Sequence, residues 1–241
     1  MWPKKWSRAT RIWKRRAREL LSPPEPLEAA VWPFEELLDR GAPPEALLLA
    51  LRLAALPLKT AAFLNWAGRQ DRVFDLEASL PQEVWWGLCT LGLLPKATEE
   101  TLEVDFATAP AVSFPYRRDK LVKGLLTLAS NPWRQDPREH YAAIYRPLGL
   151  VFFGEGVHSA AAGALKGGGR IRARVVDLSP ALSAGLEVVW KEGRPWARLP
   201  FGRTEIVKPF PQPEWAPLWQ AAARLSEEGL DLTEFLKEEG T

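Results

Sequence analysis

The amino-acid sequence predicts an α+β protein whose N-terminal half is helical and whose C-terminal half carries strands with flanking helices. Up to about Thr98, apolar runs begin at Pro and end at Gly, as helices do. Beyond that point the chain carries short β-like runs joined by Gly-rich turns. We expect a basic, Trp-rich amphipathic helix at 1–26, a helical region at 27–108, and an α+β domain with C-terminal helices at 109–241.

Composition places the chain among ordinary globular proteins. Hydrophobic residues make up 46% of it and charged residues 26%, which excludes wholesale disorder and fibrous repeats. The 22 Pro and 12 Trp, with one Met and one Cys, favour a GC-rich bacterial source, and the scarcity of thermolabile residues favours a thermophile. Cys89 cannot form an internal disulfide and is expected inside a helix core. With two His and one Cys in the sequence, no zinc site is expected and no metal ligand is assigned, although a carboxylate site for Mg²⁺ stays open.

The longest apolar stretch runs from Ala46 to Leu58 and is interrupted by Arg52. It is shorter than the roughly 20 residues that cross a bilayer. The N-terminus is basic but lacks the apolar run of a secretory signal. We therefore expect no transmembrane helix and a cytoplasmic location.

The first 18 residues are strongly basic, and Trp2, Trp6 and Trp13 recur there at helical spacing. Three interpretations fit this pattern. The Trp stripe packs on its own domain and the basic face is solvated, or the cations contact nucleic-acid phosphates, or they contact an anionic membrane surface or acidic partner. The cations assigned to nucleic-acid binding are Lys4, Lys5, Arg8, Arg11, Lys14, Arg15, Arg16 and Arg18.

Four helices are expected between residues 27 and 100, and Pro and Gly mark most of their ends. In the last of them, Ser79 followed by Pro81 and Glu83 indicates a capped start. No catalytic constellation falls in this region, so its apolar residues are interpreted as core. The expected helices are Pro33–Arg40, Pro44–Ala55, Leu58–Ala67 and one from Ser79 to about Leu91.

The second half contains a helix over Arg117–Ala129, then two β-rich pieces, His140–Tyr145 and Leu150–Phe153, that form a hairpin. If Tyr145 faces Leu150, the register places His140 opposite Glu155, so both histidines fall at one end of the hairpin. The helix has an apolar side of Leu121, Leu125, Leu126 and Leu128 and a cationic side of Arg117, Arg118, Lys120 and Lys123.

The turn Gly154-Glu155-Gly156-Val157-His158-Ser159 lies between the second of these strands and an Ala-rich helix over Val157–Leu165. Amides at a helix N-terminus lack intrahelical partners and favour anions, and glycine allows a phosphate to approach the backbone. His158 and Ser159 could both donate to such an anion. A structural turn with a capping Ser explains the same pattern.

Three segments follow one another along the chain in an order known from another protein superfamily. They are Arg117-Arg118-Asp119-Lys120-Leu121, the turn, and a strand over Ile171–Val176 that leads into Asp177. In this order, residues 116–177 resemble the ParB/sulfiredoxin-like superfamily, in which a helix and two strands precede a phosphate turn, a helix and a last strand. They resemble more closely an uncharacterised bacterial family with an Asn-Pro-Trp motif and a Gly-Asn-His-Ser turn, matched here by Asn131-Pro132-Trp133 and Gly156-Val157-His158-Ser159.

The resemblance implies a mixed sheet with flanking helices and a phosphate site. Its phosphate contacts are Gly154, Gly156, Val157, His158, Ser159, Arg117 and Arg118, with His140 behind them. The phosphate-binding Arg of the superfamily is replaced here by Ser159, and the sulfiredoxin Cys by Val157. A ParB DNA clamp and sulfiredoxin chemistry are therefore not expected. Cations of the 117–123 helix replace the missing Arg if that helix packs beside the turn.

The remaining chain is expected to be structural. The sequence predicts a second hairpin, Glu187–Trp190 with Pro195–Leu199, and a further strand over Arg203–Val207. Helices are expected over Glu214–Arg224 and Leu232–Glu238.

Two function classes follow. The first is a ParB-like protein that binds a nucleotide, with or without Mg²⁺, or a nucleic-acid phosphate at the turn, in a DNA-associated or mobile-element context. If it catalyses phosphoryl transfer or hydrolysis, His158 is the candidate acid or base and Glu155 the carboxylate that positions Mg²⁺ or water. The second class is a catalytically inert module that docks a partner protein through its Trp-rich helices.

Overall fold

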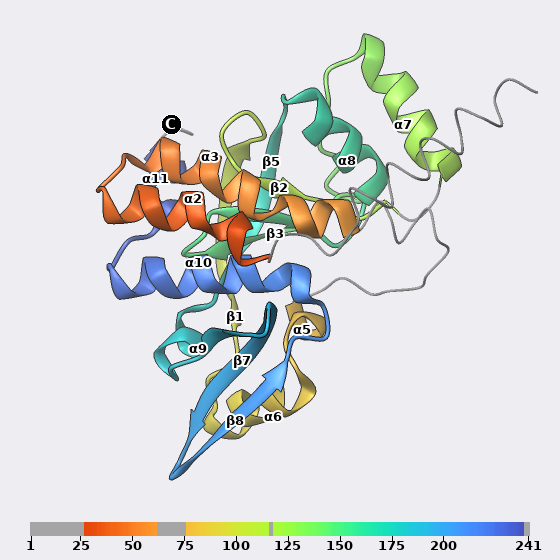
Figure 1. Cartoon of the computed structure of the whole chain (residues 1–241). Helices are drawn as coiled ribbons and strands as arrows, with labels where there is room; N and C mark the ends of the chain where they lie inside the picture. The colour runs from red at the N-terminus through yellow and green to blue at the C-terminus, as the bar shows by residue number, and fades with distance from the viewer. Residues whose placement is uncertain (1–26, 62–75, 116–117, 239–241) are drawn as a thin grey trace, which may run out of the picture.

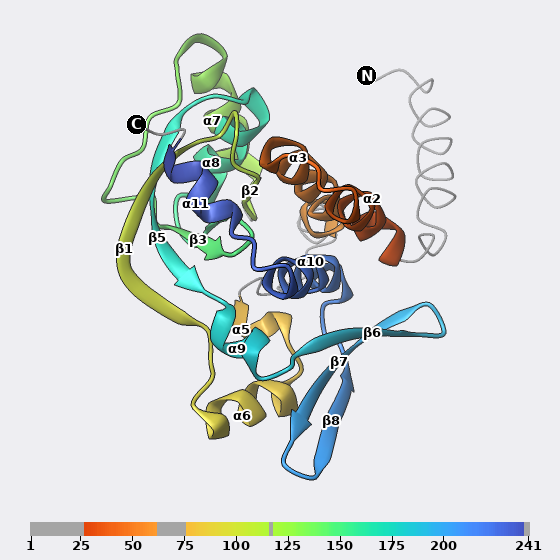
Figure 2. The ribbon, with the colours of Figure 1, turned by 90° about the vertical axis from the view of Figure 1, so that its left-hand side faces the viewer.

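Figure 1 shows the computed structural model of the chain, which describes residues 27–61, 76–115 and 118–238. Two β-sheets are surrounded by helices, which confirms the α+β class. Helices α7 (Arg118–Ser130) and α8 (Val157–Lys166) lie at one end of the molecule, and the smaller sheet lies at the other (Figures 1 and 2).

The larger sheet is mixed, with the strand order β1-β5-β3-β4-β2 among the described residues. Pairs β1–β5 and β3–β4 are antiparallel, whereas β3–β5 and β2–β4 are parallel. All four residues of β4 are buried, as in a strand covered on both faces. The strands are β1 (Lys96–Asp105), β2 (Ala111–Val112), β3 (Ala142–Arg146), β4 (Leu150–Phe153) and β5 (Arg170–Asp177).

The register of the central hairpin is the one expected from the sequence, because Tyr145 pairs with Leu150 and Ala142 with Phe153. The start of β3 and the end of β4 therefore meet at one edge of the sheet. Helix α8 begins four residues after β4, and α7 packs against it. This edge holds the site described below.

The smaller sheet is an antiparallel meander of β6 (Glu187–Lys191), β7 (Arg194–Phe201) and β8 (Thr204–Pro209). It confirms the predicted second hairpin and further strand. Helix α6 (Gln82–Leu91) covers it at Gly87, where a Cβ atom would lie 2.9 Å from the side chains of both Leu199 and Ile206. A larger residue at this position would displace the ends of these two side chains, so glycine allows the helix to approach the sheet closely.

Helices α2 (Glu28–Asp39), α3 (Pro44–Ala54) and α10 (Ala216–Glu227) pack together, and Figure 2 shows α10 between α2 and the smaller sheet. Trp219 on α10 donates from Nε1 to the hydroxyl of Ser79, over 3.0 Å. That hydroxyl donates in turn to the Leu76 carbonyl, so the end of α5 (Leu76–Ser79) is joined to α10. Short elements precede α10: α9 (Ser179–Ser183) and the 3-10 helix η1 (Pro213–Trp215).

Arg146, at the end of β3, joins α11 (Leu232–Glu238) to the sheet. Its guanidinium lies 2.9 Å from a carboxylate oxygen of Asp231, 2.7 Å from one of Glu234 and 3.1 Å from one of Glu100 on β1. Burial opposes the charge, but the three carboxylates together raise the pKa of Arg146 above its ordinary value. No helix within the described ranges has the length and apolar character needed to cross a membrane.

Several helix details differ from the sequence expectations. Helix α2 begins at Glu28 and contains Pro33, because Val31 and Phe34 are fully buried and hold the first turn in place. Ser79 does not cap α6; the N-cap residue is Pro81, and the Ser79 hydroxyl bonds within α5 and to α10. Of the segment expected to be helical over Leu58–Ala67, residues 58–61 are helical and the remainder lies outside the described ranges.

Two expected core assignments are wrong. Cys89 is exposed, because the buried side of α6 is formed by Val84, Gly87 and Leu88. On α7, Leu121 and Leu128 are buried seven residues apart, whereas Leu125 and Leu126 are 42% and 71% exposed. Leu126 lies on the opposite side of α7 from Gly124, the residue that packs on α8.

Strand β1 starts at Lys96, inside the region 27–108 that was expected to be helical, and pairs with β5 with a register shift between Ala97 and Thr101. The first part of this strand was not predicted, because most of its side chains are polar and face solvent. Because β1 falls within 27–108 and β5 within 109–241, the larger sheet draws strands from both expected regions.

Candidate functional site

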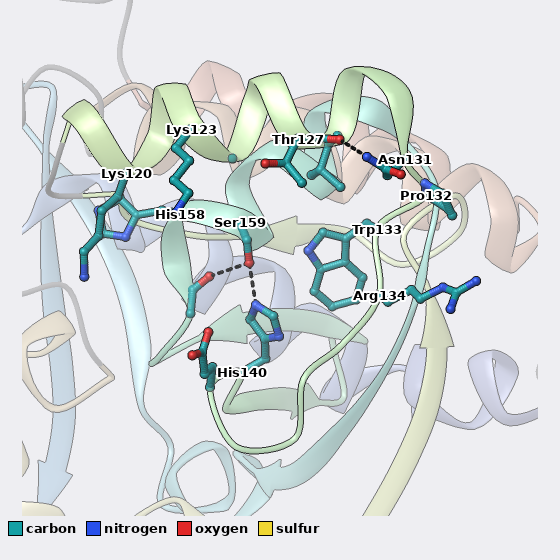
Figure 3. A pocket seen from close by; sticks show the side chains of 14 residues that line it. Lys120, Lys123, Thr127, Asn131, Pro132, Trp133, Arg134, His140, His158 and Ser159 are labelled. Carbon is teal, nitrogen blue, oxygen red and sulfur yellow. Dashed lines mark hydrogen bonds between the residues drawn. The ribbon is translucent and has the colours of Figure 1, made fainter.

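A cavity of about 730 Å³ lies between α7, the loop that leads to β3, and the first turn of α8 (Figure 3). It is open to solvent. Its size matches pockets that hold small molecules, which are typically about 300–1,000 Å³. The lining residues are Lys120, Lys123, Gly124, Thr127, Leu128, Asn131, Pro132, Trp133, Arg134, Glu139, His140, Gly156, His158 and Ser159.

The turn between β4 and α8 is held tightly at Gly156, whose φ is +66°. A Cβ atom there would lie 2.1 Å from the His140 ring and 2.6 Å from the Glu139 carbonyl oxygen, so only glycine fits. The amides of Gly154 and Glu155 both donate to the Tyr141 carbonyl, over 3.1 and 3.3 Å. These two amides therefore stabilise the end of the hairpin and do not bind a ligand.

The first hydrogen bond of α8 runs from the Ala160 amide to the Gly156 carbonyl, over 3.1 Å. The amides of residues 157–159 therefore have no intrahelical acceptor. They carry the partial positive charge of a helix N-terminus. His158 and Ser159, both on this turn, line the cavity.

His140 and Ser159 belong to a directed hydrogen-bond chain. The Asp136 amide donates to His140 Nδ1 over 2.7 Å, so the proton of the neutral ring is on Nε2. Nε2 donates to the Ser159 hydroxyl, which donates to the Gly156 carbonyl over 3.3 Å. Burial lowers the pKa of His140, which favours this neutral form.

This polarity is the reverse of the one needed for a Ser–His nucleophile. A general base must present an unprotonated nitrogen to the hydroxyl, and here that nitrogen is the one occupied by the Asp136 amide. His140 instead fixes Ser159 and closes the hairpin end against α8. The pair is therefore a positioning element of the cavity.

Cations reach the cavity from α7. Helix α7 packs on α8 through Gly124, where a Cβ atom would lie 3.5 Å from the His158 carbonyl oxygen. This close contact brings Lys120 and Lys123 to the cavity wall beside the first turn of α8 (Figure 3). The condition under which cations of this helix replace the missing Arg, that the helix packs beside the turn, is met, because α7 packs on α8.

Other predicted residues are less central. Gly154 and Glu155 are exposed and are not among the lining residues, and Val157 is buried with its carbonyl accepting from the Ser113 hydroxyl over 2.6 Å. Arg117 and the basic cluster of residues 4–18 lie outside the described ranges, and the side chain of Arg118 does too.

Trp133 is a functional candidate that was not predicted from the sequence, although it belongs to the Asn-Pro-Trp motif. The indole is 4% exposed and packs against His140, with ring centroids 5.2 Å apart. It fits because Gly163 and Gly169 have no side chains; a Cβ at either would lie within 2.9 Å of it. Its Nε1 has no hydrogen-bond partner among the described residues.

The charge of the cavity is positive. Among the described lining residues, Lys120, Lys123 and Arg134 are basic and Glu139 is the single acid, so the wall carries a formal +2 when the histidines are neutral. No group of three or more His, Cys, Asp or Glu side chains in the described part of the chain could hold a metal ion. The arrangement suits an anion with polar groups attached.

Comparison with known families matches residues 44–219 to a family of unknown function (DUF6710). The match spans more than half of the chain and includes α7, α8, both sheets and every described residue that lines the cavity. No curated protein and no solved structure matches the chain.

Proposed function

The chain belongs to a family of unknown function (DUF6710), and from its geometry we propose that it binds a phosphorylated ligand, a nucleotide or a nucleic-acid phosphate, in the cavity between α7 and α8. One observation carries the proposal. Lys120 and Lys123 line the same cavity as the first turn of α8, so two full charges and a helix N-terminus face one volume.

The Lys side chains supply the positive charge that the turn lacks. Ser159 stands where the ParB/sulfiredoxin-like superfamily has a phosphate-binding Arg, and its hydroxyl is engaged by His140 and Gly156. The ammonium groups on α7 replace that Arg from the neighbouring helix. Each Lys contributes a flexible point charge with three donors, which suits a phosphate.

We further infer that residues 116–177 form a ParB/sulfiredoxin-like unit. Helix α7, strands β3 and β4, the turn, α8 and β5 follow one another in the order of that superfamily, and β5 ends at Asp177. This order supports the assignment independently of the cavity. Binding is the function proposed, and catalysis by His158 or Glu155 forms no part of it, since Glu155 is exposed and outside the cavity lining.

The proposal is tested by ligand-dependent thermal stability in low-salt buffer. Nucleoside mono- and triphosphates, the latter with and without Mg²⁺, and short DNA should be screened against wild-type protein and a Lys120→Gln/Lys123→Gln variant. A bound ligand at a hundred times its Kd stabilises the fold by about 2.7 kcal/mol, which raises Tm measurably. We expect this rise in the wild type and its loss in the double variant.

A matched control is Lys96→Gln, which removes one exposed charge from β1, a strand that does not line the cavity. This variant should keep the ligand-induced rise. If no phosphorylated compound raises the Tm of the wild type, or if the double variant responds like the control, the proposal is wrong.

A second candidate is the interaction module, favoured by Trp32 on α2 and Trp86 on α6, each 62% exposed. Trp is enriched at protein interfaces because it combines a large apolar surface with a polar N–H group. This function predicts that Trp32→Ala and Trp86→Ala abolish association with a partner while leaving the Tm response to phosphorylated ligands unchanged.

A further inference from the structure

The cavity has two chemically different ends. Along α7, Gly124 lies opposite His158 and Ser159, whereas further along the helix the Leu128 carbonyl accepts from Lys166 Nζ over 2.7 Å. Helices α7 and α8 therefore run side by side in the same direction, and positions along one can be matched to positions along the other.

The first end is cationic. It holds Lys120, Lys123 and the N-terminal turn of α8, and Figure 3 shows both Lys side chains and His158 together on this side. The second end lies further along both helices and carries neutral polar groups from Thr127, Asn131 and Trp133. Arg134 also borders it, but its guanidinium extends away from the indole in Figure 3.

The second end contains a buried donor that the protein leaves unsatisfied. Trp133 is 96% buried, and its Nε1 has no acceptor within the described part of the chain. Figure 3 shows the indole nitrogen on the side of the ring that faces Ser159 and Thr127. Buried donors are normally paired, so an unpaired one on a cavity wall marks a position for a ligand acceptor.

The separation between the two ends can be read along α8. The Trp133 ring packs on Gly163, which lies five residues after His158. At 1.5 Å per residue, the donor is about 7–8 Å along the helix axis from the anion-binding turn. Inorganic phosphate cannot reach both ends, whereas a nucleoside monophosphate spans them with its ribose and base.

We propose that the ligand is a small phosphate monoester of nucleoside 5′-monophosphate type. Its phosphate is held by Lys120, Lys123 and the first turn of α8, and an uncharged ribose or base acceptor is bound by the Trp133 indole N–H. The proposal rests on the phosphate-binding function proposed above and adds the identity of the second contact.

The experiment is calorimetric titration of the full chain with inorganic phosphate, ribose 5-phosphate, the four ribonucleoside 5′-monophosphates, and a single-stranded DNA 12-mer without terminal phosphates. We expect at least one nucleoside monophosphate to bind more tightly than inorganic phosphate. Trp133→Phe, which keeps an aromatic ring and removes the donor, should weaken that binding about three- to tenfold. Inorganic phosphate should bind this variant as it binds the wild type.

Trp196→Phe is the matched control, because Trp196 on β7 also has a buried Nε1 without a partner among the described residues but does not line the cavity. It should leave all affinities unchanged. If Trp133→Phe lowers the Tm enough to prevent titration, Thr127→Val removes a hydroxyl from the exposed wall of the same end and should show the same selective loss.

The outcomes separate the two proposals. If neither phosphate nor any monophosphate binds, phosphate binding itself fails. If they bind but Trp133→Phe and Thr127→Val change nothing, or weaken phosphate and nucleoside monophosphate equally, the two-ended ligand is wrong while the phosphate site stands. Tighter binding of the unphosphorylated 12-mer would assign the site to a nucleic-acid backbone and overturn the small-ligand proposal.

Discussion

Replacing Gly156 with Ala tests how closely the turn approaches the hairpin end. Gly156 has a φ of +66°, and a Cβ atom there would lie 2.1 Å from the His140 ring and 2.6 Å from the Glu139 carbonyl oxygen. Ala in this conformation costs about 1–2 kcal/mol, and the clash with a backbone oxygen adds a further 1–3 kcal/mol or so of overpacking strain. The expected total is about 3 kcal/mol.

For a chain of this size, 1 kcal/mol shifts Tm by about 2–4 °C, so Gly156→Ala should lower Tm by about 6–12 °C. Gly167→Ala is the matched control. Gly167 ends the same helix with a φ of +74°, but a Cβ atom there would meet nothing within 4 Å. It should lower Tm by about 2–8 °C and by less than Gly156→Ala does, because only the backbone conformation contributes.

The assay is thermal unfolding followed by circular dichroism, with urea unfolding to obtain the free energy directly. The clash should also displace His140 and break its bond to Ser159, so Gly156→Ala should bind phosphorylated ligands more weakly than Gly167→Ala does. If the two variants lose the same free energy, the close approach of His140 to the turn is not as described.

Three further outcomes can be checked in the same way. Because burial lowers the pKa of His140, the unfolded chain binds a proton at a higher pH than the folded chain does. The free energy of unfolding should therefore be highest above the ordinary His pKa near 6.5 and should decrease as the pH falls below that value. His140→Asn should remove this pH-dependent decrease, as measured by urea unfolding. Ser79→Ala leaves the buried Nε1 of Trp219 without its acceptor and should cost about 1–3 kcal/mol, whereas Ser183→Ala, at an exposed site, should cost little. Arg146→Met should lower stability by roughly 2 kcal/mol at neutral pH, because three carboxylates lose their shared cation, and by less at pH 4; an equal loss at both pH values would contradict this.

The sequence predicted the elements around the site well. The register of a short hairpin depends on local spacing, and Tyr145 and Leu150 flank a tight connection. The register, and the position of both histidines at one end of the hairpin, could therefore be predicted. The turn before α8 was equally visible, because Gly154 and Gly156 punctuate a buried strand and an Ala-rich helix.

The parts that were missed depend on contacts between distant segments. The role of Trp133 requires Gly163 and Gly169, which lie 30 and 36 residues away, and no local pattern reveals that these glycines make room for an indole. The prediction for Leu125 and Leu126, which are exposed, was wrong for a related reason. Helical periodicity shows that a helix has an apolar stripe but not which neighbouring element covers it. Glu155 fits a catalytic motif by type, yet its side of the turn faces solvent.

The most direct test of the central claim is a crystal structure of the full chain with a nucleoside 5′-monophosphate. The account predicts that the phosphate lies between Lys120, Lys123 and the amides of residues 157–159, with a ribose or base acceptor within hydrogen-bonding distance of Trp133 Nε1. Ligand density on another surface, with the cavity between α7 and α8 empty, would contradict it.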